Sequence, residues 1–299
     1  MTEQPKTSPR LGWLPFFFIF LQSGLYGFGD PISKAAYEVL PVYSLLTARY
    51  VIALVFLLLL FGKRIVKGLK ACPPRDWLLP SLCMGGAYVS NNIALGLTAA
   101  TSVAFLRSLS TVMTPLLALV FYRRRMGRKH LPFLLLVVVG LYLLCGLGGL
   151  SGFGWGEVFS LLSALLLAGS LIFGESALDR VDPITLTTLQ TAASVLMAAL
   201  CAVSLDGGIF LRSATPAIWG TILYLALFCT VAGYLLQNAA LGAISSRTVA
   251  LLQCSCPVLT AVFSRILLGE TLSPAGMVGA GLILLCVGAE TVMKDEEAP

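Results

Sequence analysis

The stretch Asn92-Ile-Ala-Leu-Gly-Leu-Thr-Ala-Ala-Thr-Ser-Val-Ala-Phe-Leu106 occurs a second time, in altered form, as Asn238-Ala-Ala-Leu-Gly-Ala-Ile-Ser-Ser-Arg-Thr-Val-Ala-Leu-Leu252. The two copies are related by a constant offset of 146 residues. Beyond them the match resumes at an offset of 142, where Pro115 corresponds to Pro257. The slip of four residues is about one helical turn. An internal match of this kind predicts that the chain is built from two related halves.

Composition predicts a membrane protein. Hydrophobic residues make up 58% of the 299 positions and charged residues only 11%, whereas a soluble domain is about a quarter charged. Apolar runs recur at the ~20-residue length that spans a ~30 Å hydrocarbon layer. Each run must be helical, because an open strand would leave backbone groups without hydrogen bonds in lipid. The expected fold class is therefore an all-α integral membrane protein.

Apolar runs bounded by charges or turn residues predict ten transmembrane helices, five in each half. The predicted spans are 12–33, 41–62, 77–98, 102–122, 131–150, 156–178, 184–205, 216–240, 247–268 and 275–293. Residues 12–150 then form the first five-helix repeat and residues 151–293 the second, between tails at 1–11 and 294–299. Because five is odd, the second repeat must be inverted relative to the first. Inverted repeats are a recurrent architecture of secondary transporters, with the substrate site near the membrane midplane.

Lysine and arginine positions predict the orientation. With the N-terminus taken as cytoplasmic, fifteen of the twenty basic residues lie on the inner side, as the positive-inside bias requires. They are concentrated in two short loops that follow the second and fourth predicted spans. We therefore expect both termini in the cytoplasm and the protein in the plasma membrane. The same distribution argues against nucleic-acid binding as the reason for the net charge of +6.

No metal, cofactor or catalytic constellation stands out in the sequence. The one histidine, His130, lies beside a basic loop, and seven of the eight cysteines fall inside apolar runs, where they are expected to act as small packing residues. A membrane-embedded transferase would need clustered His, Asp or Glu near one face. A channel would show a pore-lining ring repeated by oligomeric symmetry. We expect a non-enzymatic protein without cofactors, monomeric or homodimeric, in the lipid bilayer.

Several short motifs resemble the drug/metabolite transporter superfamily, and within it the EamA-type ten-helix transporters. Tyr26-Gly27, Lys34 and Arg49 resemble the family's Trp-Gly, Lys and second-helix Arg, with Tyr26 in place of the usual Trp. The most specific similarity runs from Pro257 to Leu268-Gly269-Glu270-Thr271-Leu272. The similarity covers almost the whole chain. It implies ten helices around a central cavity that opens alternately to the two sides of the membrane.

Ionisable groups inside predicted spans are the first functional candidates, because each costs ~2.5–3.5 kcal/mol to insert. Arg107 corresponds to Gln253 in the other repeat, so both are expected at one interface, where a guanidinium suits a substrate carboxylate. The alternative for Arg107 is a structural ion pair or snorkelling. Glu175 and Asp30 are candidates for coupling transport to protons. Their alternatives are a salt bridge near the cytoplasmic end for Glu175 and a helix cap for Asp30.

Uncharged polar residues are more numerous in these spans than lipid packing requires. Those expected at the cavity, beside Arg107 and Gln253, are Tyr26, Tyr88, Asn91, Asn92, Gln237, Asn238 and Ser255. Interhelical hydrogen bonds explain any one of them, and the repeat-related Asn92 and Asn238 are interpreted first as struts between helices. Arg49, Pro115 and Pro257 are predicted to be structural.

Together these patterns favour a secondary transporter that moves a small-molecule metabolite, an amino acid or related carboxylate-bearing solute, as an exporter. The alternative within transport is a proton-coupled exporter of cationic drugs. Arg107 in the cavity would disfavour cations, whereas Asp30 and Glu175 would favour them. A channel and a membrane-embedded transferase are more remote alternatives.

Overall fold

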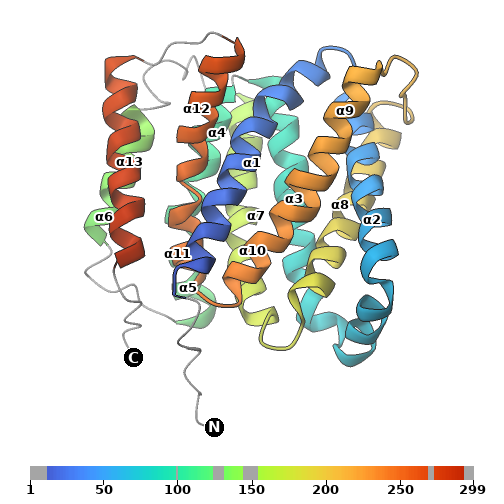
Figure 1. Ribbon diagram of the computed structural model, residues 1–299, viewed down its shortest axis with the longest axis horizontal. Helices are drawn as coiled ribbons and strands as arrows, with labels where there is room; N and C mark the ends of the chain where they lie inside the picture. Colours follow the sequence, from blue (N-terminus) through green and yellow to red (C-terminus); the bar gives the residue numbers. More distant parts are fainter. Residues whose placement is uncertain (1–11, 99, 124–130, 144–153, 269–272, 293–299) are drawn as a thin grey trace.

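A computed structural model describes residues 12–98, 100–123, 131–143, 154–268 and 273–292, and these residues contain helices and no strand (Figure 1). In chain order the helices are α1 (Leu14–Tyr37), α2 (Val42–Ala71), α3 (Pro74–Leu97), α4 (Ala100–Ser108), α5 (Ser110–Tyr122), α6 (Leu131–Leu141), α7 (Trp155–Ala177), α8 (Pro183–Leu205), α9 (Pro216–Tyr224), the π-helix η2 (Leu225–Ala232), α10 (Gly233–Leu241), α11 (Ser246–Leu252), α12 (Ser255–Leu268) and α13 (Pro274–Val292). The prediction of an all-helical chain is confirmed for this part of the sequence.

Six helical stretches within the described ranges are long and apolar enough to cross a membrane. They are Val42–Ala71, Val103–Tyr122, Trp155–Ala177, Pro183–Leu205, Pro216–Leu241 and Ser246–Phe263. α1 and α3 have comparable lengths but include charged side chains such as Asp30 and Asp76, and Leu131–Leu141 and Pro274–Ala289 are shorter apolar helices. Large apolar side chains such as Leu59 and Val120 face outward, as lipid contact requires. The chain is a multi-pass membrane protein.

The second predicted span ends too early. α2 continues past residue 62 to Ala71, so Lys63, Arg64, Lys67 and Lys70 lie on its last turns and not in a loop, as the sequence had indicated. Lysine and arginine are good helix formers. The helix stops only before Pro73 and Pro74, because the residue before a proline is driven away from helical backbone angles.

Two predicted spans contain a break of one or two residues, at which the backbone keeps angles close to helical. The span 102–122 is interrupted at Leu109, between α4 and α5, and the span 247–268 at Gln253 and Cys254, between α11 and α12. Pro257 has no N–H to donate to the Gln253 carbonyl, and that carbonyl accepts from the Cys256 N–H at 2.9 Å instead. In the first half the break lies where the two repeats slip by four residues.

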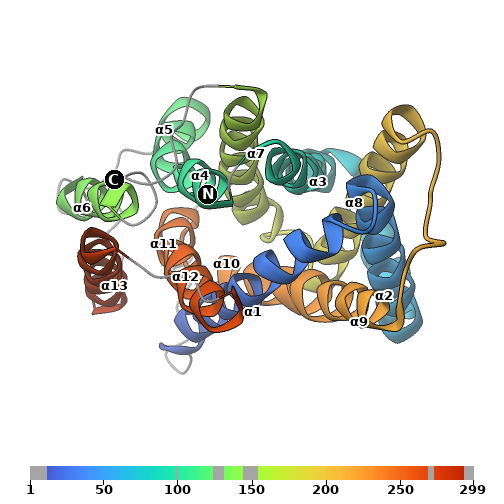
Figure 2. The same ribbon diagram turned by 90° about the horizontal axis from the view of Figure 1, so that it is seen from above.

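The two halves of the chain are interleaved. α3 packs on α7 and α8, while α1 packs on α10 and α12, so every one of these contacts joins the first half to the second. Seen from above (Figure 2), α6 and α13 lie together at one end of the bundle and α2, α8 and α9 at the other. Contacts between the halves therefore form much of the interior.

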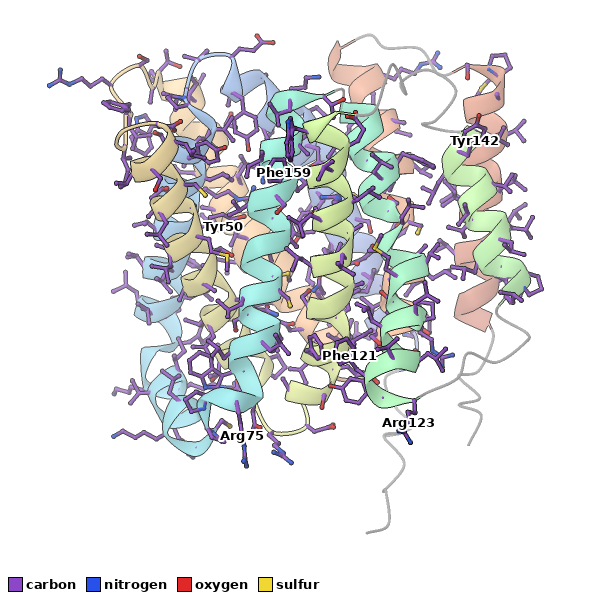
Figure 3. The ribbon with its side chains drawn as sticks, turned by 180° about the vertical axis from the view of Figure 1, so that it is seen from behind. Tyr50, Arg75, Phe121, Arg123, Tyr142 and Phe159 are labelled. Atoms are coloured by element: carbon purple, nitrogen blue, oxygen red, sulfur yellow. The ribbon has the colours of Figure 1, made fainter. Side chains whose placement is uncertain are left out.

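Corresponding helices of the two halves start at opposite faces. α1 starts at the lower face in Figure 1. In Figure 3, Phe159 marks the start of α7 at the upper face, whereas Arg75 and Arg123 project from the lower face. α1 and α7 thus run in opposite directions.

Replacing Gly27 with alanine is expected to destabilise the protein. A Cβ atom at Gly27 would lie 2.9 Å from the backbone nitrogen of Thr260, because α1 and α12 approach closely there. Backbone atoms cannot rotate away, so we expect a loss of about 1–3 kcal/mol. Gly24→Ala is the control on the same helix, since a Cβ there meets nothing within 4 Å. Thermal unfolding in detergent checks this, and equal midpoints for the two variants would rule out a close α1–α12 contact.

Candidate functional site

A polar cavity lies at the two helix breaks. It consists of two adjoining hollows that share Tyr26, Tyr88 and Arg107 in their walls. The larger hollow also contacts residues at both breaks: Ser108, Ser110, Gln253, Cys254 and Cys256. The smaller hollow is completed by polar and charged residues that include Asp30, Arg49, Asn91 and Asn92. Both halves of the chain contribute to the walls.

Arg107 and Gln253, the pair related by the internal repeat, both line the larger hollow. Arg107 is in the last turn of α4 and Gln253 follows α11 directly. The offset between the repeats predicted equivalent positions for Arg107 and Gln253. In the structure, Arg107 lies beside the break in the first half and Gln253 at the break in the second. Each break therefore contributes a polar side chain of its own half to the same cavity wall.

Arg107 is loosely paired with Asp30. Its Nη2 atom lies 3.7 Å from Asp30 Oδ2 and 3.7 Å from Cys256 Sγ, and the two charged side chains are 13% and 26% exposed. A well-formed hydrogen bond between such groups measures about 2.7–2.9 Å. The structure gives Nε and Nη1 of Arg107 no hydrogen-bond partner among the described residues. Arg107 therefore keeps donors for a further acceptor in the cavity.

Arg49, interpreted from the sequence as structural, also lines the smaller hollow. Its Nε donates to Thr230 Oγ1 at 2.8 Å, and its guanidinium lies 5.3 Å from the Tyr50 ring centroid. Thr230 is held in turn by donating to the Leu225 carbonyl at 3.1 Å, a bond across the π-helix η2. Such π-turns are frequent at functional sites.

Three glutamines connect the first half to the second beside the larger hollow. Gln22 Nε2 donates to Gln237 Oε1 at 3.0 Å, and Gln253 Nε2 donates to Gln22 Oε1 at 3.1 Å and to Gln237 Oε1 at 2.9 Å. This amide cluster joins α1 to α10 and to the break after α11. Gln237 Nε2 and Gln253 Oε1 have no partner in the part of the chain that the structure describes.

Asn92 and Asn238 each link two helices. Asn92 accepts a hydrogen bond from the Tyr37 hydroxyl, which joins α3 to α1. Asn238 Nδ2 donates to Thr187 Oγ1 at 2.9 Å and to Gln190 Oε1 at 2.7 Å, which joins α10 to α8. Asn92 also touches the smaller hollow, whereas Asn238 is not among the wall residues of either hollow.

Aromatic rings form the boundary between the hollows. Tyr26 and Tyr88 meet edge to face at 5.9 Å between ring centroids, and Tyr88 lies 5.3 Å from Tyr234. A Cβ at Gly233 would lie 2.8 Å from the Tyr26 ring, so glycine at this position makes room for it. Tyr26 and Tyr88 are thus held in place by close packing.

Some candidates from the sequence lie outside the walls. Glu175 Oε2 accepts from the Ser246 N–H at 3.0 Å, at the start of α11. Ser255 Oγ donates to the Leu252 carbonyl at 2.8 Å, and Gln237 reaches the cavity only through the amide cluster. Pro115 and Pro257 are buried within α5 and α12, just beyond the breaks.

Sequence reasoning missed the wall residues that the breaks expose. Ser108 and Ser110 flank the first break and line the larger hollow. The available signal was the four-residue slip between the repeats, followed by Pro115 and Pro257. In the described ranges, no group of three or more His, Cys, Asp or Glu is arranged to hold a metal ion.

Comparison with known proteins identifies the family. The profile of the EamA-like transporter family matches the chain twice, over residues 13–146 and 154–288. The chain belongs to the EamA-like transporter family. It is a membrane transporter of the drug/metabolite transporter type, as its motifs had indicated.

Relatives of this EamA family member are named as transporters. An uncharacterized transporter of Archaeoglobus fulgidus is 26% identical over 263 residues, which cover 88% of this chain and 81% of the relative. A protein of Salmonella typhimurium named "Probable amino-acid metabolite efflux pump" is 28% identical over 215 residues, covering 68% and 70% of the two chains. A crystal structure of a protein with 16% identity superposes with a TM-score of 0.77 over 92% of this chain and 95% of that one. That last likeness shows the fold alone.

Proposed function

We propose that this EamA family member is a secondary carrier that exports a small carboxylate-bearing metabolite, an amino acid or a related solute, by alternating access. The observation that carries the proposal is Arg107, a guanidinium with unused donors that lines a cavity between the two halves. A guanidinium fork binds a carboxylate through two parallel hydrogen bonds. The printed name of the Salmonella relative supports an amino-acid-like solute.

The proposed topology has ten membrane crossings in two inverted five-helix repeats, with both termini in the cytoplasm and the protein in the plasma membrane. The opposite directions of α1 and α7 support the inversion (Figures 1 and 3). In this arrangement α4–α5, α9–α10 and α11–α12 each form one crossing. α1, α3, α6 and α13 supply crossings beyond the six apolar stretches.

Binding of a carboxylate to Arg107 replaces its contact with Asp30. The Arg107–Asp30 contact of 3.7 Å is long for an ion pair, so a solute that makes shorter bonds displaces the aspartate. Asp30 then lacks its nearest cation in a low-dielectric site, where a proton neutralises it. Solute and proton are then bound at the same time and cross the membrane together, so net export follows the outward gradient of the solute.

A proton-coupled exporter of cationic drugs is the second candidate, and Asp30 in the cavity wall is the observation that favours it. Asp30 faces two guanidinium groups in the same hollow, Arg49 and Arg107. A cation entering this hollow would meet a net positive charge, and like charges at close range repel strongly in a low dielectric. The charge balance therefore favours an anionic group.

Uptake into proteoliposomes with an imposed pH gradient tests the proposal. The assay offers labelled amino acids, simple carboxylates and a cationic dye such as ethidium to the purified protein. We expect carboxylate-bearing solutes to accumulate above empty liposomes and the dye to stay at background. Movement of the dye alone would replace this proposal with the cationic exporter.

A further inference from the structure

Arg49 is the buried cation that no described acid neutralises directly. Its side chain is 5% exposed, yet the ion pairs of the described residues include none to Arg49. The hydrogen bond that Arg49 makes within the described ranges runs from Nε to the neutral hydroxyl of Thr230 at 2.8 Å. A buried charge needs compensation, and Asp30 in the same hollow is shared with Arg107, so an anion that binds Arg49 would supply the remaining negative charge.

The surroundings of Arg49 are those of a binding wall. It lines the same hollow as Arg107, and the two arginines come from different helices, α2 and α4. Asn91, 4% exposed, lies in that wall with its Oδ1 lacking a partner among the described residues. Asp30 is the one carboxylate of the described wall residues. Two guanidinium groups thus share one carboxylate.

We propose that Arg49 is a second anion-binding residue and that the cavity takes solutes with two acidic groups, one on Arg107 and one on Arg49. This inference rests on the proposed function, since it extends the carboxylate site at Arg107. With Asp30 neutralised by a proton, the two guanidinium charges are balanced by a dicarboxylate and not by a monocarboxylate. Arg49 and Arg107 line the same hollow, so a short dicarboxylate is the solute that would reach both.

A pair of probes of equal size isolates the second charge. Succinate and its mono-amide, succinamate, have the same number of heavy atoms and differ by one carboxylate. In wild-type proteoliposomes, we expect succinate uptake to exceed succinamate uptake by about tenfold or more, the value of one charged hydrogen-bonding pair. In Arg49→Gln, succinate uptake falls to the succinamate level while succinamate uptake stays within about twofold of wild type.

Asn238→Ala is the control, because Asn238 is a buried strut outside the walls. It is expected to lower both rates in proportion, which is the pattern of a purely structural loss. Two results would overturn the second anion site while leaving the proposed function intact. One is equal uptake rates of succinamate and succinate in wild type. The other is an Arg49→Gln variant in which both uptake rates fall in proportion. Should wild type move neither probe nor any other carboxylate, the proposed function itself fails. The comparison of succinate and succinamate uptake in wild type tests the second anion site even if Arg49→Gln does not fold.

Discussion

Arg107→Gln is expected to reduce the initial rate of carboxylate uptake by roughly 100-fold, because breaking a buried charge pair costs about 2–5 kcal/mol. Glutamine keeps part of the side-chain length and a hydrogen-bond donor but removes the charge and the fork. It also leaves Asp30 without the cation that lies 3.7 Å away. Initial rates of labelled solute uptake in proteoliposomes, normalised to inserted protein, measure the effect.

Two further variants separate the loss of the Arg107 charge from the loss of its planar fork and from a nonspecific effect of removing an arginine. Arg107→Lys keeps the charge but not the planar fork, so we expect an intermediate rate. Arg212→Gln is the matched control, because Arg212 is an exposed arginine in the segment after α8 and its loss should leave uptake unchanged. If Arg107→Gln transports carboxylates at the wild-type rate, Arg107 does not bind the substrate.

Asp30→Asn is expected to abolish uptake driven by a pH gradient while exchange of solute between the two sides continues. Asparagine cannot carry the proton that replaces the Arg107 contact. The titratable and charged groups that interact with Asp30 are Arg107, Arg49, Tyr37, Cys229 and Cys256. None of these other groups is an acid comparable to Asp30. Solute accumulation measured with and without a pH gradient, in wild type and Asp30→Asn, tests this expectation.

Glu175→Gln is the matched control for the loss of a carboxylate. Glu175 accepts a hydrogen bond from the Ser246 backbone at the start of α11 and lies outside the cavity walls. The glutamine carbonyl retains that acceptor, so we expect coupling to be preserved. If Glu175→Gln loses pH-driven uptake while Asp30→Asn keeps it, the coupling proton is carried by Glu175 on α7 and not by Asp30 on α1.

The membrane fold follows from sequence because its causes are local. Length and hydropathy decide which segments enter lipid. The constant offset between the two repeats predicted that Arg107 and Gln253 occupy equivalent positions at one interface. The break at Gln253 has a local cause in the missing N–H of Pro257, whereas no proline follows Leu109 at that spacing. Ser108 and Ser110 look like ordinary polar residues in an apolar run, and whether a helix breaks there depends on packing against the other half.

The charged residues were harder to place than the helices. A sequence shows that Arg49 and Glu175 are inside spans but not which partners face them. The structure gives Glu175 a backbone N–H at the start of α11, and it gives Arg49 a single hydroxyl partner, Thr230. These partners lie far along the chain, so only the tertiary fold decides which charge is satisfied and which is left for a ligand.

Counterflow tests alternating access most directly. Proteoliposomes are loaded with unlabelled carboxylate, diluted into a trace of the labelled solute, and followed over time without any ion gradient. A carrier whose cavity opens to one side at a time should show transient accumulation of label above equilibrium, because outward-moving unlabelled solute returns the site to the outside. Label that rises only to equilibrium, at a rate independent of the internal solute, would contradict the account and indicate a channel.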